Sequence, residues 1–158
     1  MLARGSFARR AFSLIEVVIV VVIIGIIAAI AIPRMSRGSA GAANSALSGN
    51  LAVLRSAIDL YATEHGGEYP EVATIVAQLT TYSDHTGATS ATKTGAYIYG
   101  PYLRDVPALP VGAKKGSTPI PAADGAGVGW IYNEPPGAIA ANTTASEVDD
   151  TGTKYNTY

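Results

Sequence analysis

The sequence predicts an α+β fold in which a long N-terminal α-helix packs on a small C-terminal antiparallel β-sheet. Three observations lead to this prediction: a long apolar segment near the N-terminus, an amphipathic helical pattern after it, and a C-terminal part rich in glycine, proline and tyrosine with short alternating segments. We expect the first half of the helix to cross a membrane and the second half to cover the sheet.

The apolar segment covers residues 12–33, FSLIEVVIVVVIIGIIAAIAIP. A helix over residues 12–32 would be about 31 Å long at roughly 1.5 Å per residue, which matches the hydrocarbon core of a bilayer. Its many β-branched residues favour strands in water, but a single strand in lipid leaves its backbone groups unpaired, whereas a helix pairs them internally. We therefore predict a transmembrane helix, with Gly25 and Pro33 as positions of flexibility or kinking.

Glu16 is the charged residue within this segment. The surrounding Ile and Val side chains, at about −0.3 to −0.6 kcal/mol each, outweigh an acidic penalty of roughly +2.5 to +3.5 kcal/mol. The carboxylate either pairs with a cation inside an assembly or reaches the headgroups at a membrane edge. An ordinary signal peptide has a shorter apolar region followed by a cleavage site, for which Ala28-Ala29 offers only a weak match. A plain membrane anchor explains the length but not the glutamate.

The N-terminus carries a resemblance in Arg9-Arg10-Ala11, followed by Phe12-Ser13-Leu14-Ile15-Glu16 and the apolar run. This pattern resembles the processing signal of the type IV filament superfamily, which comprises type IV pilins and type II secretion pseudopilins. The resemblance implies that a prepilin peptidase cleaves between Ala11 and Phe12, that Phe12 is N-methylated, and that the helix is retained. It also implies that Glu16 pairs with the Phe12 amine of a neighbouring subunit during assembly. Ala11 departs from the family, which usually has glycine there.

An amphipathic pattern follows the apolar segment. Its apolar residues recur at intervals of four and three, which places them on one face of a helix: Leu47, Leu51, Leu54, Ile58 and Tyr61. Gly66-Gly67 is expected to end this helix. Between the two halves, a segment poor in helix formers that includes Gly38 and Gly41 is expected to be flexible.

These patterns predict four parts: a leader at residues 1–11, a membrane or filament-core helix at 12–33, its amphipathic continuation at 34–67, and a globular head at 68–158. Within the head we expect a short helix or turn at 72–79, a loop at 82–95, an irregular Pro/Gly-rich loop at 100–127, and strands at 96–99, 128–132 and 138–141. With the long helix, this is the pilin architecture that the resemblance implies.

The composition excludes several classes of function. The 158-residue chain has no cysteine, which excludes disulfides, thiolate chemistry and cysteine-based zinc sites. Loss of the three leader arginines would lower the basic count from 11 to 8 against 12 acids, a net charge of −4, so nucleic acid is not an expected partner. His65 and His85 have no partner at catalytic spacing, and no GxSxG or phosphate-binding loop occurs, so we do not expect an enzyme.

The acidic C-terminal tail offers a possible metal site. Glu147, Asp149 and Asp150 carry hard oxygen ligands of the kind that calcium prefers. Major pseudopilins, which this chain resembles, carry a calcium loop near the C-terminus. The alternative interpretation is a solvated acidic tail without metal, and we expect no other cofactor.

Two further stretches resemble the G-type, or major, pseudopilins of type II secretion: residues 54–61 with Gly66-Gly67-Glu68-Tyr69-Pro70, and Gly100-Pro101-Tyr102-Leu103. The last third instead resembles the terminal hairpin of related prepilin-type proteins. The resemblance implies a filament subunit of a periplasmic pseudopilus for protein secretion; the alternatives are the major pilin of an adhesive or motile type IV pilus and a membrane-anchored binding module that never polymerises.

The resemblance also implies partners and a location. The partners are further copies of the chain, minor pilins or pseudopilins, the prepilin peptidase, an inner-membrane assembly platform, and the lipid bilayer before assembly. The chain is expected to cross the bacterial inner membrane once, with its C-terminal domain outside the cytoplasm, before it enters a periplasmic pseudopilus or an extracellular pilus.

Overall fold

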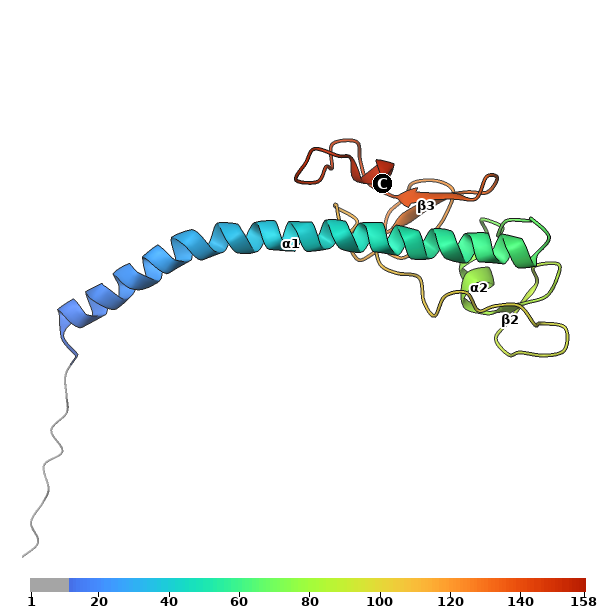
Figure 1. The fold of residues 1–158 in the computed structure, drawn as a ribbon, viewed down its shortest axis with the longest axis horizontal. Coiled ribbons are helices and arrows are strands. Elements are labelled where there is room, and N and C mark those ends of the chain that lie inside the picture. The colour runs from blue at the N-terminus through green and yellow to red at the C-terminus, as the bar shows by residue number, and fades with distance from the viewer. Residues whose placement is uncertain (1–11) are drawn as a thin grey trace, which may run out of the picture. The chain divides into compact units, whose positions relative to one another are not determined.

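The computed structural model describes residues 12–158 and has an α+β fold, as the sequence predicts. Two two-stranded antiparallel sheets are formed, β1 with β2 and β3 with β4. The chain divides into two compact units, residues up to Ser39 and Ala40–Tyr158. The elements in chain order are α1 (Leu14–Glu64), α2 (Ile75–Thr80), β1 (Tyr82–Ser83), β2 (Thr89–Ser90), β3 (Trp130–Asn133), β4 (Ala138–Ala141) and the 3₁₀-helix η1 (Tyr155–Thr157) (Figure 1).

Helix α1 begins where the Ser13 carbonyl accepts the amides of Glu16 and Val17, at 3.0 and 3.3 Å. It ends, as predicted, at the glycine pair. Gly66 and Gly67 have φ angles of 69° and 97°, which are left-handed values that glycine adopts without strain. The Gly67 amide donates to the Ala62 carbonyl at 2.8 Å, the bond that closes a Schellman motif.

The helix is continuous through the residues for which flexibility is predicted: Gly25, Pro33, Gly38 and Gly41. Near the three glycines nothing lies within 4 Å of the place where a Cβ would stand. No close packing therefore requires glycine at these positions. The predicted kink and flexible segment remain predictions about the assembled state.

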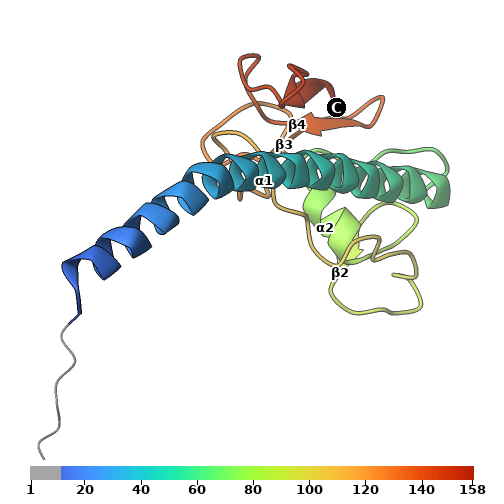
Figure 2. The same ribbon diagram turned by 60° about the vertical axis from the view of Figure 1, so that its left-hand side comes forward.

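The core of Ala40–Tyr158 forms on the predicted apolar face of α1. All five residues of that pattern are buried: Leu47, Leu51, Leu54, Ile58 and Tyr61. The hairpin β3–β4 lies on one side of this half of α1, and α2 with β2 lies on the other, in both views (Figures 1 and 2). The head is thus built around the second half of the helix.

The β3–β4 hairpin contributes the largest buried side chains. Trp130 and Tyr132 of β3 are fully buried, and their cross-strand partners Ala141 and Ile139 are buried as well. The Trp130 indole Nε1 donates to the Pro107 carbonyl at 2.8 Å. The polar atom of this large side chain is therefore satisfied in the core.

The strand predictions hold in part. Strand β4 has the predicted bounds, β3 begins two residues later than predicted, and the short helix predicted at 72–79 is α2. The predicted strand at 96–99 is wrong, because Tyr99 forms only an isolated bridge to Ser83. The Thr94 hydroxyl accepts the Tyr97 amide at 3.3 Å, and the chain bends at residues 95–96 instead of running on as a strand. The predicted loop at 82–95 contains the short strands β1 and β2.

Candidate functional site: the apolar helix segment and its carboxylate

The segment from Leu14 to Ile32 presents an apolar surface that carries one charged side chain, Glu16. Leu14–Ile32 of α1 is long and apolar enough to cross a membrane, by length and composition, and no part of this apolar stretch is buried within the protein. Its 19 residues span about 28 Å at 1.5 Å per residue. An apolar surface of this extent requires lipid or another apolar surface to cover it.

Glu16 lies in the first turn of α1, four residues after Phe12, which precedes the helix. Together with Val17, Val20 and Val21 the two residues line a groove of about 230 Å³. Phe12 is 80% exposed, and Glu16 is exposed as well. Within residues 12–158 the Glu16 carboxylate has no hydrogen-bond or ion-pair partner. A carboxylate on an apolar helix therefore lacks the cation that would make its burial tolerable.

The proposed processing site lies at the edge of the described residues. Phe12 is described, whereas Ala11 lies outside them. The cleavage between the two, the methylation of Phe12 and the assembly role of Glu16 therefore stay predictions from the sequence.

The acidic residues of the C-terminal tail each have partners within the protein. Glu147 Oε1 accepts the Ala113 amide at 2.5 Å, and Asp150 Oδ1 accepts the Asn44 side-chain amide at 2.9 Å. Asp149 Oδ1 accepts the amides of Thr151 and Thr153, both at 2.8 Å. In the part of the chain that the structure describes, no group of three His, Cys, Asp or Glu side chains is placed to hold a metal ion. Calcium binding by this tail stays a prediction.

These hydrogen bonds favour the ionised carboxylates. The hydroxyl of Tyr158 and then that of Thr151 hold the pKa of Asp149 well below its usual value. The backbone amides of Thr144 and Ala113 lower the pKa of Glu147. The ionised carboxylates of Glu147 and Asp149 thus stabilise loops of the head by accepting hydrogen bonds from them.

His65 has a packing role that its position in the sequence did not indicate. Its ring is buried and stacks on Tyr61, with ring centroids 3.8 Å apart. Its Nδ1 lies 2.9 Å from the Tyr61 carbonyl oxygen, and its Nε2 lies 2.9 Å from the Asp84 carbonyl oxygen. The histidine joins the end of α1 to the β1–β2 loop. His85 is exposed.

Comparison with known proteins gives one finding about the N-terminus. Residues 6–32 match the family described as the Prokaryotic N-terminal methylation motif. No curated protein and no solved structure matches the chain. The motif and the exposed apolar helix together support a type IV pilin-like or pseudopilin subunit that a prepilin peptidase processes and that a single helix anchors in a membrane.

Proposed function

We propose that this chain is the major pseudopilin of a type II secretion system, a structural subunit that polymerises into a periplasmic filament. The observation that carries the proposal is the apolar segment of α1, none of which is buried within the protein, with one carboxylate that has no partner within residues 12–158. Such a segment is suited to two successive environments, the bilayer before assembly and a bundle of identical helices after it.

The proposed mechanism is assembly, with Glu16 setting the register. In the bilayer an apolar helix gains little from the hydrophobic effect when it meets another helix, so packing and polar contacts decide the association. A Phe12 amine released by cleavage would supply the cation for Glu16 of a neighbouring subunit. A subunit displaced along the filament axis would leave both charges buried and unpaired, which is strongly unfavourable.

Sequence features favour the pseudopilin over the pilin. The chain lacks the cysteines that close the C-terminal loop of many type IV pilins, and the segments around Tyr61 and Pro101 resemble major pseudopilins. The alternative within the class is the major pilin of a type IV pilus. Deletion of the gene separates the two, since loss of protein secretion with intact surface motility supports the pseudopilin, and the reverse result supports the pilus.

The role of Glu16 is tested by substitution in the full chain. Glu16→Ala should insert into the membrane normally, yet the yield of sheared filaments should fall about tenfold or more, because loss of one member of a buried ion pair costs about 3–5 kcal/mol. Asp105→Ala is the matched control, since Asp105 is exposed in the head and its carboxylate makes no hydrogen bond within residues 12–158. Equal filament yields from Glu16→Ala and the control would contradict the proposed role of Glu16. The absence of filaments from the unaltered chain would favour an anchored module that does not polymerise.

A further inference from the structure

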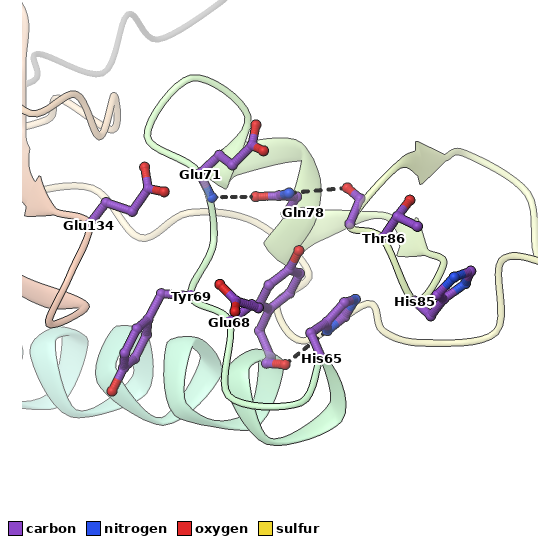
Figure 3. A pocket seen from close by; sticks show the side chains of 10 residues that line it. His65, Glu68, Tyr69, Glu71, Gln78, His85, Thr86 and Glu134 are labelled. Carbon is purple, nitrogen blue, oxygen red and sulfur yellow. Dashed lines mark hydrogen bonds between the residues drawn. The ribbon is translucent and has the colours of Figure 1, made fainter.

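A polar pocket of about 230 Å³ lies beside the C-terminal end of α1 (Figure 3). Its walls come from the end of α1, the segment that leads to α2, α2 itself, the β1–β2 loop and the β3–β4 turn. The lining residues are Tyr61, His65, Glu68, Tyr69, Glu71, Gln78, His85, Thr86, Gly87 and Glu134. The pocket belongs entirely to the unit Ala40–Tyr158 and is separate from the apolar segment of α1.

The pocket has a negative lining. Three of its ten lining residues are glutamates, and none is lysine or arginine. Glu134 Oε2 accepts the Val72 amide at 3.1 Å. The carboxylates of Glu68 and Glu71 have no hydrogen-bond or ion-pair partner in the part of the chain that the structure describes. Two negative charges at the pocket are therefore left without a counter-charge.

A tyrosine hydroxyl without a hydrogen-bond partner in the described residues also opens onto this pocket. Tyr61 is only 3% exposed, with its ring stacked on His65. Among residues 12–158 no group forms a hydrogen bond with its hydroxyl, which lines the pocket while the rest of the side chain is buried. Burial, followed by the charges of Glu71 and Asp84, raises the pKa of Tyr61, so the group is a neutral hydroxyl with an unused acceptor site.

The pocket is held open by its neighbours. A Cβ at Gly87 would stand 2.6 Å from the Tyr61 hydroxyl oxygen, so glycine leaves the space in front of that oxygen free. Gln78 Oε1 accepts the Glu71 amide at 2.9 Å, and Gln78 Nε2 donates to the Gly87 carbonyl at 3.0 Å (Figure 3). Gln78 of α2 therefore connects the segment before α2 to the β1–β2 loop in the absence of a ligand. Less conformational entropy is then lost when a ligand binds.

We propose that this pocket binds an organic ammonium group, carried by a free amine or by a lysine side chain of a partner protein. Glu68 and Glu71 supply the opposite charge, and the Tyr61 hydroxyl oxygen accepts a hydrogen bond from the ammonium. A metal ion fits less well, because no group of three metal-ligating side chains is gathered in the described residues. This inference does not depend on the filament proposal.

The test is a titration of the ¹⁵N-labelled full chain in detergent micelles, followed by NMR. The probes are n-butylammonium, n-butanol as its uncharged counterpart, Nα-acetyl-lysine methylamide, and calcium chloride. The reporters are the backbone amides of Thr86 and Gly87 and the side-chain amide of Gln78. Glu68→Gln and Glu71→Gln each remove one pocket charge from an exposed residue, and Asp59→Asn removes the same charge from an exposed residue of α1 outside the pocket.

We expect n-butylammonium to saturate these signals with a Kd of about 1 mM, which corresponds to about −4 kcal/mol, and n-butanol to leave them unchanged. Each glutamine variant should weaken binding about threefold, and the double variant about tenfold. Tyr61→Phe should weaken it about fivefold through the lost hydrogen bond. Binding of n-butylammonium alone would indicate a free amine, whereas binding of the lysine derivative as well would indicate a lysine side chain.

Three results would overturn the proposal. The first is the absence of saturable shifts with both amines. The second is equal weakening by Asp59→Asn and Glu71→Gln, because the attraction would then come from the overall charge of the protein. The third is saturation of the same reporters by equimolar calcium chloride with exclusion of n-butylammonium, which would make the pocket a metal site.

Discussion

At the scale of single residues, both carboxylate oxygens of Asp149 accept hydrogen bonds from later residues of the C-terminal segment. One oxygen accepts the amides of Thr151 and Thr153, and the other accepts the Tyr158 hydroxyl at 2.5 Å. The same hydrogen bond raises the pKa of Tyr158 to about 12, so this hydroxyl remains a donor at neutral pH. The segment is therefore fastened by an ionised carboxylate in a chain without disulfides.

Because the pKa of Asp149 is depressed in the folded state, the stability of the head is expected to depend on pH. Because the folded-state pKa lies below the ordinary value of 3.8, the stabilisation is present above about pH 3.8 and is lost as pH falls towards the folded-state value. Asp149→Asn should lower the melting temperature at pH 7 and flatten the acid limb of a stability profile, measured by circular dichroism between pH 2 and 7.

Asp105→Asn is the control for this experiment, because the exposed Asp105 carboxylate accepts no hydrogen bond within residues 12–158. It should leave both the melting temperature and the acid limb unchanged. A profile of Asp149→Asn that overlays the wild-type profile at every pH would show that the carboxylate hydrogen bonds do not stabilise the head.

At the scale of elements, the second half of α1 has two faces of different character. Leu54 is fully buried against the head, whereas its neighbour Val53 is 51% exposed. Val53 and Leu60 lie with Tyr102 along an apolar surface groove. The buried face stabilises the head, and the other face is free in the single chain.

A pair of alanine substitutions tests this division. Leu54→Ala should reduce the free energy of unfolding of the head by about 2–5 kcal/mol, through lost burial and the cavity it leaves. Val53→Ala, one residue away on the same helix, should change it by less than about 0.5 kcal/mol. Urea unfolding followed by Trp130 fluorescence reports on the head directly, since Trp130 lies in its core. Equal losses from the two variants would contradict the assignment of faces.

Sequence patterns predict the buried face of α1 correctly but predict a strand at 96–99 that does not form. The apolar face of α1 repeats over many residues, so its period predicts the buried side chains correctly. The segment at 96–99 has the alternation of a strand but is irregular after a bend at 95–96, because the Thr94 hydroxyl accepts hydrogen bonds from the amides of Ala96 and Tyr97 at 3.4 and 3.3 Å. A local side-chain to backbone bond of this kind competes with strand pairing and leaves no periodic signal.

At the scale of the whole molecule, the N-terminal motif and the apolar helix could be predicted because contiguous residues carry them. The pocket at the end of α1 could not, since its lining comes from residues between Tyr61 and Glu134 that only the folded chain brings together. The packing of His65 between Tyr61 and the Asp84 carbonyl was missed for the same reason. Contacts between distant segments have no counterpart in the local spacing of residues.

We propose that the chain is processed as a prepilin and then assembles through its apolar helix. The most direct test is the intact mass and N-terminal residue of the protein purified from its native membranes. Processing as a prepilin predicts a chain that begins at Phe12 and carries one additional methyl group on its amine. A chain that begins at Met1, or one cleaved after the apolar segment, would contradict it.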